Sequence, residues 1–242
     1  MKNYQIIVQY DGSEFCGWQI QKEKSTVQGI ITEAISKLLR EEINLIGAGR
    51  TDAGVHAFGQ SANFRCEKEI DLCKFKYSLN SILPKSISIN KIEEKEFSFH
   101  SRFDAIKRIY YYFVCNIKSP FYYKYSYFYY SDLTLLNLNR MSKLLSGEQD
   151  FSAFEKEGNS NENSICNIME AHWSKRGDFY IFRIEANRFL RGMVRAIVGT
   201  MLKIERNNGD GDNFKHIIEK KDRKYAGDSA PAQGLFLYKV RY

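Results

Sequence analysis

Apolar and polar positions alternate along some stretches of the chain and recur with helical spacing along others. Residues 4–10 alternate and end at the turn pair Asp11-Gly12, a pattern typical of a β-strand. Thr26 is a residue type that often precedes a helix, and apolar residues then recur every three to four positions as far as Leu39. The first half is further expected to hold a helix over 71–82 and strands near 43–46, 58–66 and 86–93.

The second half shows the same mixture of patterns. Helices are expected near 133–145, 187–204 and 213–221, and strands near 107–116, 165–175, 178–186 and 235–240. Antiparallel strands interspersed with helices predict an α+β fold, with a largely antiparallel mixed sheet flanked by helices. A boundary near 104–106 would divide the chain into two similar α+β halves, 1–105 and 106–242, that share one sheet.

The most loop-like segment of the first half is GAGRTDAGVH, residues 47–56. It is not a dinucleotide fingerprint, because Asp52 stands where the third glycine belongs, and it lacks the GK[ST] of a phosphate-binding loop. Glycine-flanked turns surround Asp52, and Arg50 lies two residues before it. An ionised carboxylate in such a loop can serve as a nucleophile or base. The alternative, a helix cap paired with Arg50 on the surface, stays open.

Helical spacing over 187–204 predicts one apolar face and an opposite face with three arginines, Arg188, Arg191 and Arg195. Residues 183–206 carry six basic and two acidic side chains, an excess of four in a chain whose net charge is +7. Arginines without an acidic partner on their face favour a phosphate site, and a solvated face is the alternative. The overall positive charge points in the same direction, toward a polyanionic partner.

Twelve tyrosine and phenylalanine side chains lie within residues 110–130. Base stacking is one interpretation of this cluster, and high β-propensity in an edge hairpin is the favoured one for most of its members. Tyr110 is the exception, because Lys107 and Arg108 lie beside it, and it stays a candidate site residue.

Several classes of protein are not indicated. No stretch of about 18 apolar residues predicts a membrane span, and the short apolar run 6–8 does not resemble a signal peptide, so we expect a cytoplasmic protein. The five cysteines are widely spaced without a CxxC, which favours buried free thiols over a zinc site or a disulfide framework. The histidines lack metal-ligand spacing. His56 is close to Asp52, and a structural role is favoured for it. Residues 207–212 read as an exposed turn.

The segment GRTDAGVHA, residues 49–57, resembles the active-site motif of the TruA family of tRNA pseudouridine synthases. The resemblance extends over nearly the whole chain, with further matches in the family's order. They are YDG (10–12), GWQ (17–19), TVQG (26–29), LN (79–80), LP (83–84), FHSRFDA (99–105), KRIYYY (107–112), DF (150–151), Phe154, FL (189–190), MVR (193–195) and APAQGL (230–235).

This resemblance implies isomerisation of uridine to pseudouridine in the anticodon stem-loop of tRNA, at positions 38–40, with neither a cofactor nor a metal. Asp52 matches the family's catalytic aspartate, Tyr110 its active-site tyrosine, and Arg195 the arginine expected to pair with the aspartate. Whether the aspartate attacks C1′ or C6, or assists a glycal route, stays open. The same isomerisation on ribosomal or another structured RNA, and a non-catalytic RNA-binding protein, are the alternatives.

The family also implies how RNA is bound. The target base must leave its stack, and a basic cleft where the two halves meet can offset that cost. Arg50 is expected to help extrude the nucleotide, and Arg188 and Arg191 to meet phosphate or solvent. The other candidates for RNA contact are His56, Lys107 and Arg108. Members of the family are homodimers, and the tRNA is expected to lie across both subunits.

Overall fold

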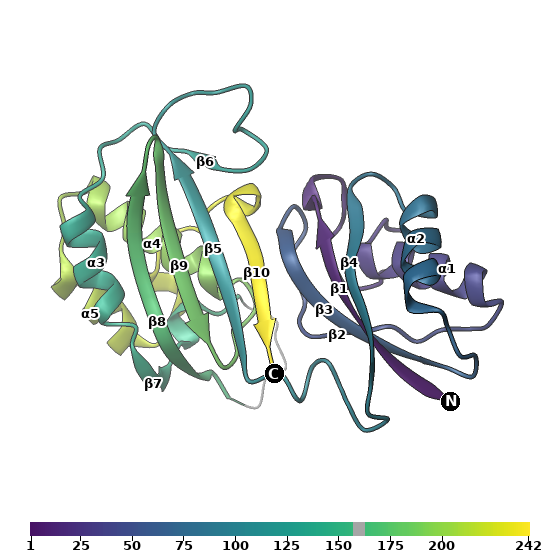
Figure 1. Cartoon of the computed structure of the whole chain (residues 1–242). Helices are drawn as coiled ribbons and strands as arrows, with labels where there is room; N and C mark the ends of the chain where they lie inside the picture. The colour runs from purple at the N-terminus through teal and green to yellow at the C-terminus, as the bar shows by residue number, and fades with distance from the viewer. Residues whose placement is uncertain (157–162) are drawn as a thin grey trace. The chain divides into compact units, whose positions relative to one another are not determined.

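The computed structural model describes residues 1–156 and 163–242. Within these ranges it contains ten β-strands and five α-helices, and the strands pair mostly antiparallel (Figure 1). The predicted α+β class is therefore confirmed, while the expected RNA-binding cleft stays a prediction. The chain divides into two compact units. The first is Met1–Ile106 with Phe236–Tyr242, and the second is Lys107–Leu235.

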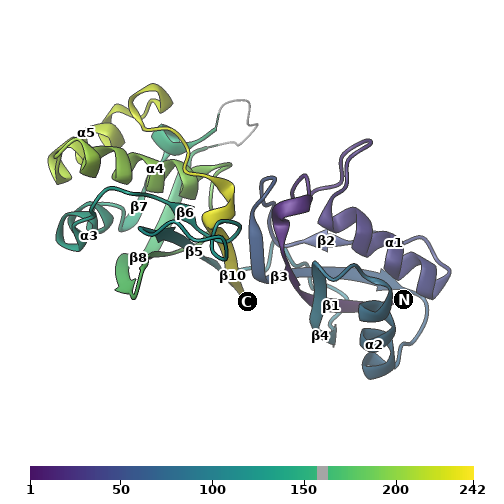
Figure 2. The same ribbon diagram turned by 90° about the horizontal axis from the view of Figure 1, so that it is seen from above.

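The first unit is built on a sheet with the strand order β4-β1-β3-β10, and its short strand β2 pairs with β3. Strand β1 is antiparallel to both of its neighbours, and β10 runs parallel to β3. Helices α1 and α2 lie beside each other in this unit (Figures 1 and 2). The elements are β1 (Lys2–Tyr10), α1 (Val27–Leu39), β2 (Ile46–Gly47), β3 (His56–Cys66), α2 (Leu72–Ile82), β4 (Ile87–Lys95) and β10 (Leu235–Arg241).

Alternation along β1 separates the two faces of this sheet, as the sequence predicts. Tyr4 is fully buried, and its ring lies 5.7 Å from that of Phe64 on β3. Phe64 in turn lies 6.2 Å from Phe75 of α2, so the face that carries Tyr4 is the one covered by helix. The opposite face carries polar residues such as Gln5 and Ser61, whose side chains hydrogen-bond at 2.8 Å.

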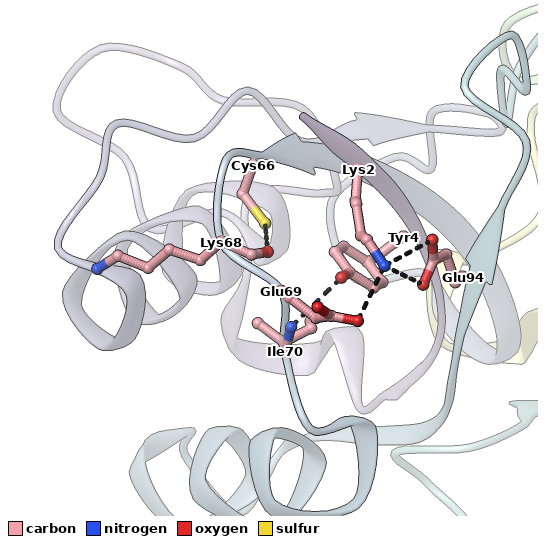
Figure 3. A network of polar contacts seen from close by, with 7 residues as sticks. All are labelled: Lys2, Tyr4, Cys66, Lys68, Glu69, Ile70 and Glu94. Carbon is pink, nitrogen blue, oxygen red and sulfur yellow. Dashed lines mark hydrogen bonds and ion pairs between the residues drawn. The ribbon is translucent and has the colours of Figure 1, made fainter.

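A polar network holds the beginning of β1 (Figure 3). The Lys2 ammonium contacts Glu69 at 3.1 Å and Glu94 at 3.3 Å, and the Ile70 amide donates to the Tyr4 hydroxyl at 3.3 Å. The hydrogen bond with Glu69 leads the causes that raise the pKa of Lys2. The network fixes the opposite end of the strand from Tyr10, which lies next to the candidate site described below.

The second unit is built on a sheet with the strand order β5-β9-β8-β7, and its three helices gather together (Figure 2). Trp173 of β8 packs against α4, with its indole Nε1 3.4 Å from Met201 Sδ, and the Asn139 side chain of α3 bonds both backbone groups of Trp173. The elements are β5 (Lys107–Cys115), β6 (Tyr127–Phe128), α3 (Leu135–Lys143), β7 (Gly147–Asp150), β8 (Ile165–Arg176), β9 (Phe179–Ala186), α4 (Met193–Arg206) and α5 (Gly211–Lys220).

The helix predicted over 187–204 begins six residues late, at Met193. Asn187 explains part of the delay, because its side-chain oxygen accepts from the Arg188 amide at 2.7 Å and the Asn167 amide at 2.9 Å, which stabilises a bend after β9. Gly192 then adopts a left-handed φ of 71° before the first helical residue. The prediction that Arg188 and Arg191 share a helical face with Arg195 is therefore wrong.

Two strand predictions also need correction. Over 43–46 only Ile46 is in a strand, because the Ile43 amide and the Leu45 carbonyl bond Ser36 and Gln28 of α1 instead of a neighbouring strand. The aromatic segment 121–130 does not form an edge hairpin. Its one strand is β6, which pairs parallel with β5, and a turn bonded from Tyr125 to Tyr122 precedes it.

The expectation of buried free thiols holds for three of the five cysteines, and the turn expected over 207–212 is present and largely exposed. All five cysteines are free thiols, but only Cys66, Cys115 and Cys166 are buried as expected. Cys16 is half-buried and Cys73 is exposed. Burial raises the pKa of the Cys166 thiol to about 11. Asp210 ends the largely exposed turn by capping α5, since its carboxylate accepts from the Asp212 and Asn213 amides.

Candidate active site

Asp52 lies in the loop between β2 and β3, and its side chain is half-buried. The Val55 amide donates to the Asp52 carbonyl at 3.2 Å, which closes a tight turn. Gly54 inside this turn has a φ of 78°, a left-handed conformation that glycine adopts without strain. The loop therefore has a defined backbone conformation with the carboxylate at its beginning.

The end of β1 and the segment after it hold this loop through three hydrogen bonds. The Tyr10 hydroxyl lies 2.8 Å from Thr51 Oγ1, and both side chains are buried. The Trp18 amide donates to the Thr51 carbonyl at 3.1 Å, and the Gly54 amide donates to the Phe15 carbonyl at 3.4 Å. The residues on both sides of Asp52 are thus fixed to one neighbouring segment.

Two glycines make this close approach possible. A Cβ atom on Gly12 would lie 2.0 Å from the Val55 carbonyl oxygen, and one on Gly17 would lie 2.5 Å from the Thr51 carbonyl oxygen. Gly17 also has a φ of 88°, which disfavours any side chain. The glycines of YDG and GWQ are therefore explained by backbone contact with the Asp52 loop.

His56 follows the loop and is 1% exposed. Its Nδ1 accepts from the Gly12 amide at 3.1 Å and lies 3.2 Å from Asp11 Oδ1, and its ring stacks on Phe236 at 4.6 Å. These contacts agree with the structural role favoured for His56. A side chain that is so little exposed has no surface for contact with RNA.

Arg50, by contrast, is exposed. Its Nε donates to the Gln19 side chain at 3.2 Å, so the arginine is oriented by the GWQ segment that also holds the loop. Its guanidinium is accessible to a phosphate or a displaced nucleotide.

Tyr110 lies on β5 in the second unit and is 8% exposed. It stands opposite Ile184 of β9, and the Phe189 ring meets its ring edge-on at 5.1 Å and 85°. Edge-to-face packing of this kind fixes the plane of an aromatic ring. Tyr110 is thus a buried ring whose plane is fixed by Phe189.

Lys107 and Arg108 both have partners inside the second unit. The Lys107 ammonium pairs with the buried Glu185 carboxylate, which also accepts from Arg183 at 2.7 Å. Burial acts to raise the pKa of Glu185, but the hydrogen bonds from the two cations outweigh it, and the pKa lies below its ordinary value. Arg108 donates to the Asn187 carbonyl at 2.7 Å. These contacts support strands β5 and β9 next to Tyr110.

Arg195 occupies the first turn of α4 and is half-buried. Its Nε donates to the Ala230 carbonyl at 2.7 Å, and the Ala230 amide returns a hydrogen bond of 2.9 Å to the Arg195 carbonyl. The next residue, Pro231, accepts at 2.8 Å from Tyr112, a buried tyrosine whose pKa burial raises well above its ordinary value. The APAQGL segment therefore fixes the guanidinium of Arg195.

The remaining two arginines lie between β9 and α4. Arg191 is exposed in a turn, and Arg188 is half-buried with its guanidinium 3.3 Å from the Asn163 side-chain oxygen. They form no common face with Arg195, so each would have to reach RNA independently.

The groups that hold the candidate residues are not evident from the sequence. Tyr10, Gly12, Gly17 and Ala230 all contact a candidate residue or its loop, and each lies in one of the short motifs quoted above. For Gly12 and Gly17, a glycine in a turn-like motif is the sequence feature that indicates such a backbone contact. Within the described residues, no group of three His, Cys, Asp or Glu side chains could hold a metal ion, and no helix is long and apolar enough to span a membrane.

Comparison with known proteins assigns the family. A profile of the tRNA pseudouridine synthase family matches residues 6–104 and 141–242. The chain belongs to this family. The tRNA pseudouridine synthase A of Bacteroides thetaiotaomicron is 41% identical over 245 residues, which cover the whole chain and 91% of that protein. Synthases of the same name from Parabacteroides distasonis and Pseudothermotoga lettingae are 43% and 38% identical, again over the whole chain and over 96% and 100% of those proteins.

Family membership extends to both units. The matched range 6–104 contains the Asp52 loop, and 141–242 contains Arg195 with the segment that fixes it. The full-length similarity to synthases also spans Tyr110 on β5. The candidate residues therefore lie in parts of the chain that align with tRNA pseudouridine synthases.

Proposed function

We propose that this protein isomerises uridine to pseudouridine in tRNA, at positions 38–40 of the anticodon stem-loop, with Asp52 as the essential carboxylate. The observation that carries the proposal is the GRTDAGVHA loop, held by Tyr10, Phe15 and Trp18, in a chain that aligns over its full length with tRNA pseudouridine synthases. The protein would act in the cytoplasm.

The reaction needs no group from outside the substrate. The C1′–N1 bond of uridine breaks, the uracil turns within the site, and a C1′–C5 bond forms, while C5 loses its hydrogen and N1 gains one. A carboxylate can assist by covalent attack or by stabilising positive charge at the ribose. The backbone hydrogen bonds on both sides of Asp52 favour either role, because a catalytic group must be held in position during the change.

Tyr110 and Arg195 are proposed to serve the same uridine. The edge-on contact with Phe189 gives Tyr110 a fixed plane, which suits stacking on a displaced uracil. Arg195 is proposed to pair with the Asp52 carboxylate, and the hydrogen bond from its Nε to Ala230 supports a fixed direction for the rest of the guanidinium.

Binding of tRNA would depend on exposed cations. Arg50 and Arg191 are exposed and suit phosphate contact, and Arg50 is proposed to help extrude the target nucleotide. Arg188 is a weaker candidate, since its guanidinium contacts Asn163. Lys107 and Arg108 are proposed to act by supporting strand β5, which carries Tyr110. A homodimer that binds one tRNA across both subunits completes the proposal.

The test measures tritium release from unmodified tRNA labelled at C5 of uridine. Asp52→Ala and Asp52→Asn should abolish release while the dissociation constant for tRNA stays within a few fold of the wild type. Asp178→Asn, which removes the same charge from an exposed turn, should behave as the wild type. Activity retained by the Asp52 variants would show that another group performs the catalysis. Binding without activity in the wild type would favour a non-catalytic RNA-binding protein.

A further inference from the structure

Strand β3 contains a β-bulge directly after the Asp52 loop. Val8 of β1 pairs with Gln60, but Tyr10 pairs with Ala57, so Phe58 and Gly59 together stand opposite the single residue Gln9. Bulges re-aim side chains and are frequent beside active sites. Ala57 shares the helix-covered face with Tyr10, so Phe58 points to the opposite, polar face of the sheet.

Phe58 is the outer ring of an aromatic stack. It is 41% exposed, and its inner side lies parallel to Phe236 at 4.9 Å and 15°. Phe236 is buried and lies on His56 at 4.6 Å and 19°. Two buried rings therefore support one exposed ring and hold its plane fixed, so little conformational entropy remains to be lost when a ligand stacks on it.

Exposed amide and aromatic side chains lie on the strands beside Phe58. Gln9 is exposed, and its side-chain oxygen accepts from the exposed Asn90 amide at 3.0 Å. Tyr238 lies two residues after Phe236 on β10 and is 43% exposed. Gly59 allows this strand to approach, because a Cβ there would lie 2.6 Å from the Tyr238 carbonyl oxygen. Exposed aromatic rings beside amide groups suit an unpaired nucleobase better than an apolar protein surface.

We propose that Phe58 is a stacking site for an unpaired nucleobase of the tRNA, one that flanks the uridine brought to Asp52. This rests on the proposed function for the identity of the RNA. The stack adjoins the Asp52 loop, because the His56 ring at its base accepts from Gly12, and Gly12 packs on Val55 of that loop. A nucleotide next to the uridine at Asp52 would reach Phe58 across this short connection.

Binding of unmodified tRNA tests the contribution of the ring. Phe58→Ala should weaken binding about 5- to 150-fold, the equivalent of about 1–3 kcal/mol for one stacked base. Phe58→Tyr should bind as the wild type, because it keeps the ring. The slope of log Kd against log salt should not change, since stacking releases no counterions. Tyr77→Ala, which removes a ring that is 77% exposed on α2, is the matched control and should have no effect.

A fluorescence experiment tests the stacking itself and does not depend on the alanine variant. The natural tryptophans, Trp18 and Trp173, are buried, so Phe58→Trp adds an exposed reporter. Its emission should be quenched by tRNA and by octauridine but not by a blunt RNA duplex, and Tyr77→Trp should stay unquenched.

Unquenched emission from Phe58→Trp, or tRNA binding by Phe58→Ala within twofold of the wild type, would overturn the proposal. A shift of Phe58→Ala to a smaller oligomer with unchanged RNA binding would also overturn it and assign Phe58 to a protein interface. These results are separate from the proposed function, because tritium release by the wild type reports the isomerisation whether or not Phe58 stacks.

Discussion

Gly17→Ala tests whether the segment after β1 controls the position of Asp52. The added methyl would lie 2.5 Å from the Thr51 carbonyl oxygen and 3.1 Å from the Asp52 carbonyl carbon. Both neighbours are backbone atoms, so the loop or the GWQ segment must move as a whole. The substitution therefore displaces the catalytic loop without changing any residue within it.

Two costs combine in this variant. An alanine at a φ of 88° is strained by about 1–2 kcal/mol. Crowding of a packed region costs about 1–3 kcal/mol more. The lower conformational entropy of the unfolded alanine chain acts in the opposite direction. It favours folding by about 0.4–1 kcal/mol and so offsets part of the loss. The net destabilisation expected is about 1–5 kcal/mol.

Gly147→Ala is the matched control. Gly147 has a φ of 92°, but no atom lies within 4 Å of the position its Cβ would take. It therefore carries the backbone strain alone, and the difference between the two variants isolates the contact with the Asp52 loop, about 1–3 kcal/mol. Urea denaturation of each variant gives the free energies of unfolding.

Activity gives the second measurement. A displacement of about 1 Å at a reacting group can reduce the rate about 100-fold. We expect a large fall in kcat for tritium release by Gly17→Ala and wild-type kcat for Gly147→Ala, with both assayed at a temperature where each is folded. If the two variants lose the same stability and keep the same kcat, the contact between Gly17 and the loop does not position Asp52.

Three further predictions concern the candidate residues and the groups that support them. Tyr10→Phe removes the hydrogen bond to Thr51 and should cost about 0.5–1.5 kcal/mol and lower kcat more than it changes KM, whereas an unchanged kcat would limit Tyr10 to packing. Glu185 has a lowered pKa when folded, so its stabilisation is complete above the ordinary glutamate pKa of about 4.3 and is lost as pH falls through the folded value. The difference in Tm between wild type and Glu185→Gln should therefore shrink from pH 7 to pH 3, and a difference independent of pH would contradict this. Arg191→Gln should reduce the salt slope of tRNA binding by about 1, and an unchanged slope would make Arg191 a solvated side chain.

Periodicity predicts most elements of this fold because most of them bury one face. The alternation of β1 and the helical spacing of α1 both follow from burial, and Thr26 caps α1 as expected, accepting from the Gly29 amide at 3.3 Å. Where side chains bond the backbone, the pattern fails. Ile43 and Leu45 are buried like strand residues, yet their backbone groups bond α1 side chains.

The late beginning of α4 shows the same limit. Leu190 and Met193 are both buried, so the apolar spacing continues across a boundary that hydrogen bonds of Asn187 and the left-handed Gly192 determine. Helical spacing therefore predicts correctly that Arg195 is helical, but it wrongly groups Arg195 with Arg188 and Arg191, which precede α4. The aromatic segment 121–130 fails for another reason, since β-propensity needs a partner strand and only Tyr127 and Phe128 have one.

The candidate site divides in a similar way. Asp52, Tyr110 and Arg195 could be selected from sequence because charge and motif order identify them. The residues that hold them could not be assigned from sequence. The hydrogen bonds between Tyr10 and Thr51 and between Arg195 and Ala230 join residues that are far apart in the chain. Burial of His56 and the pairing of Lys107 with Glu185 are likewise properties of the folded units.

Position-resolved mapping of pseudouridine tests the central claim most directly. Total tRNA is taken from a strain that lacks this gene and from the same strain carrying either the wild-type gene or Asp52→Ala. The account predicts pseudouridine at positions 38–40 with the wild-type gene and uridine there in the other two strains. Pseudouridine restored at these positions by Asp52→Ala, or an unchanged pattern in tRNA when the gene is absent, would contradict it.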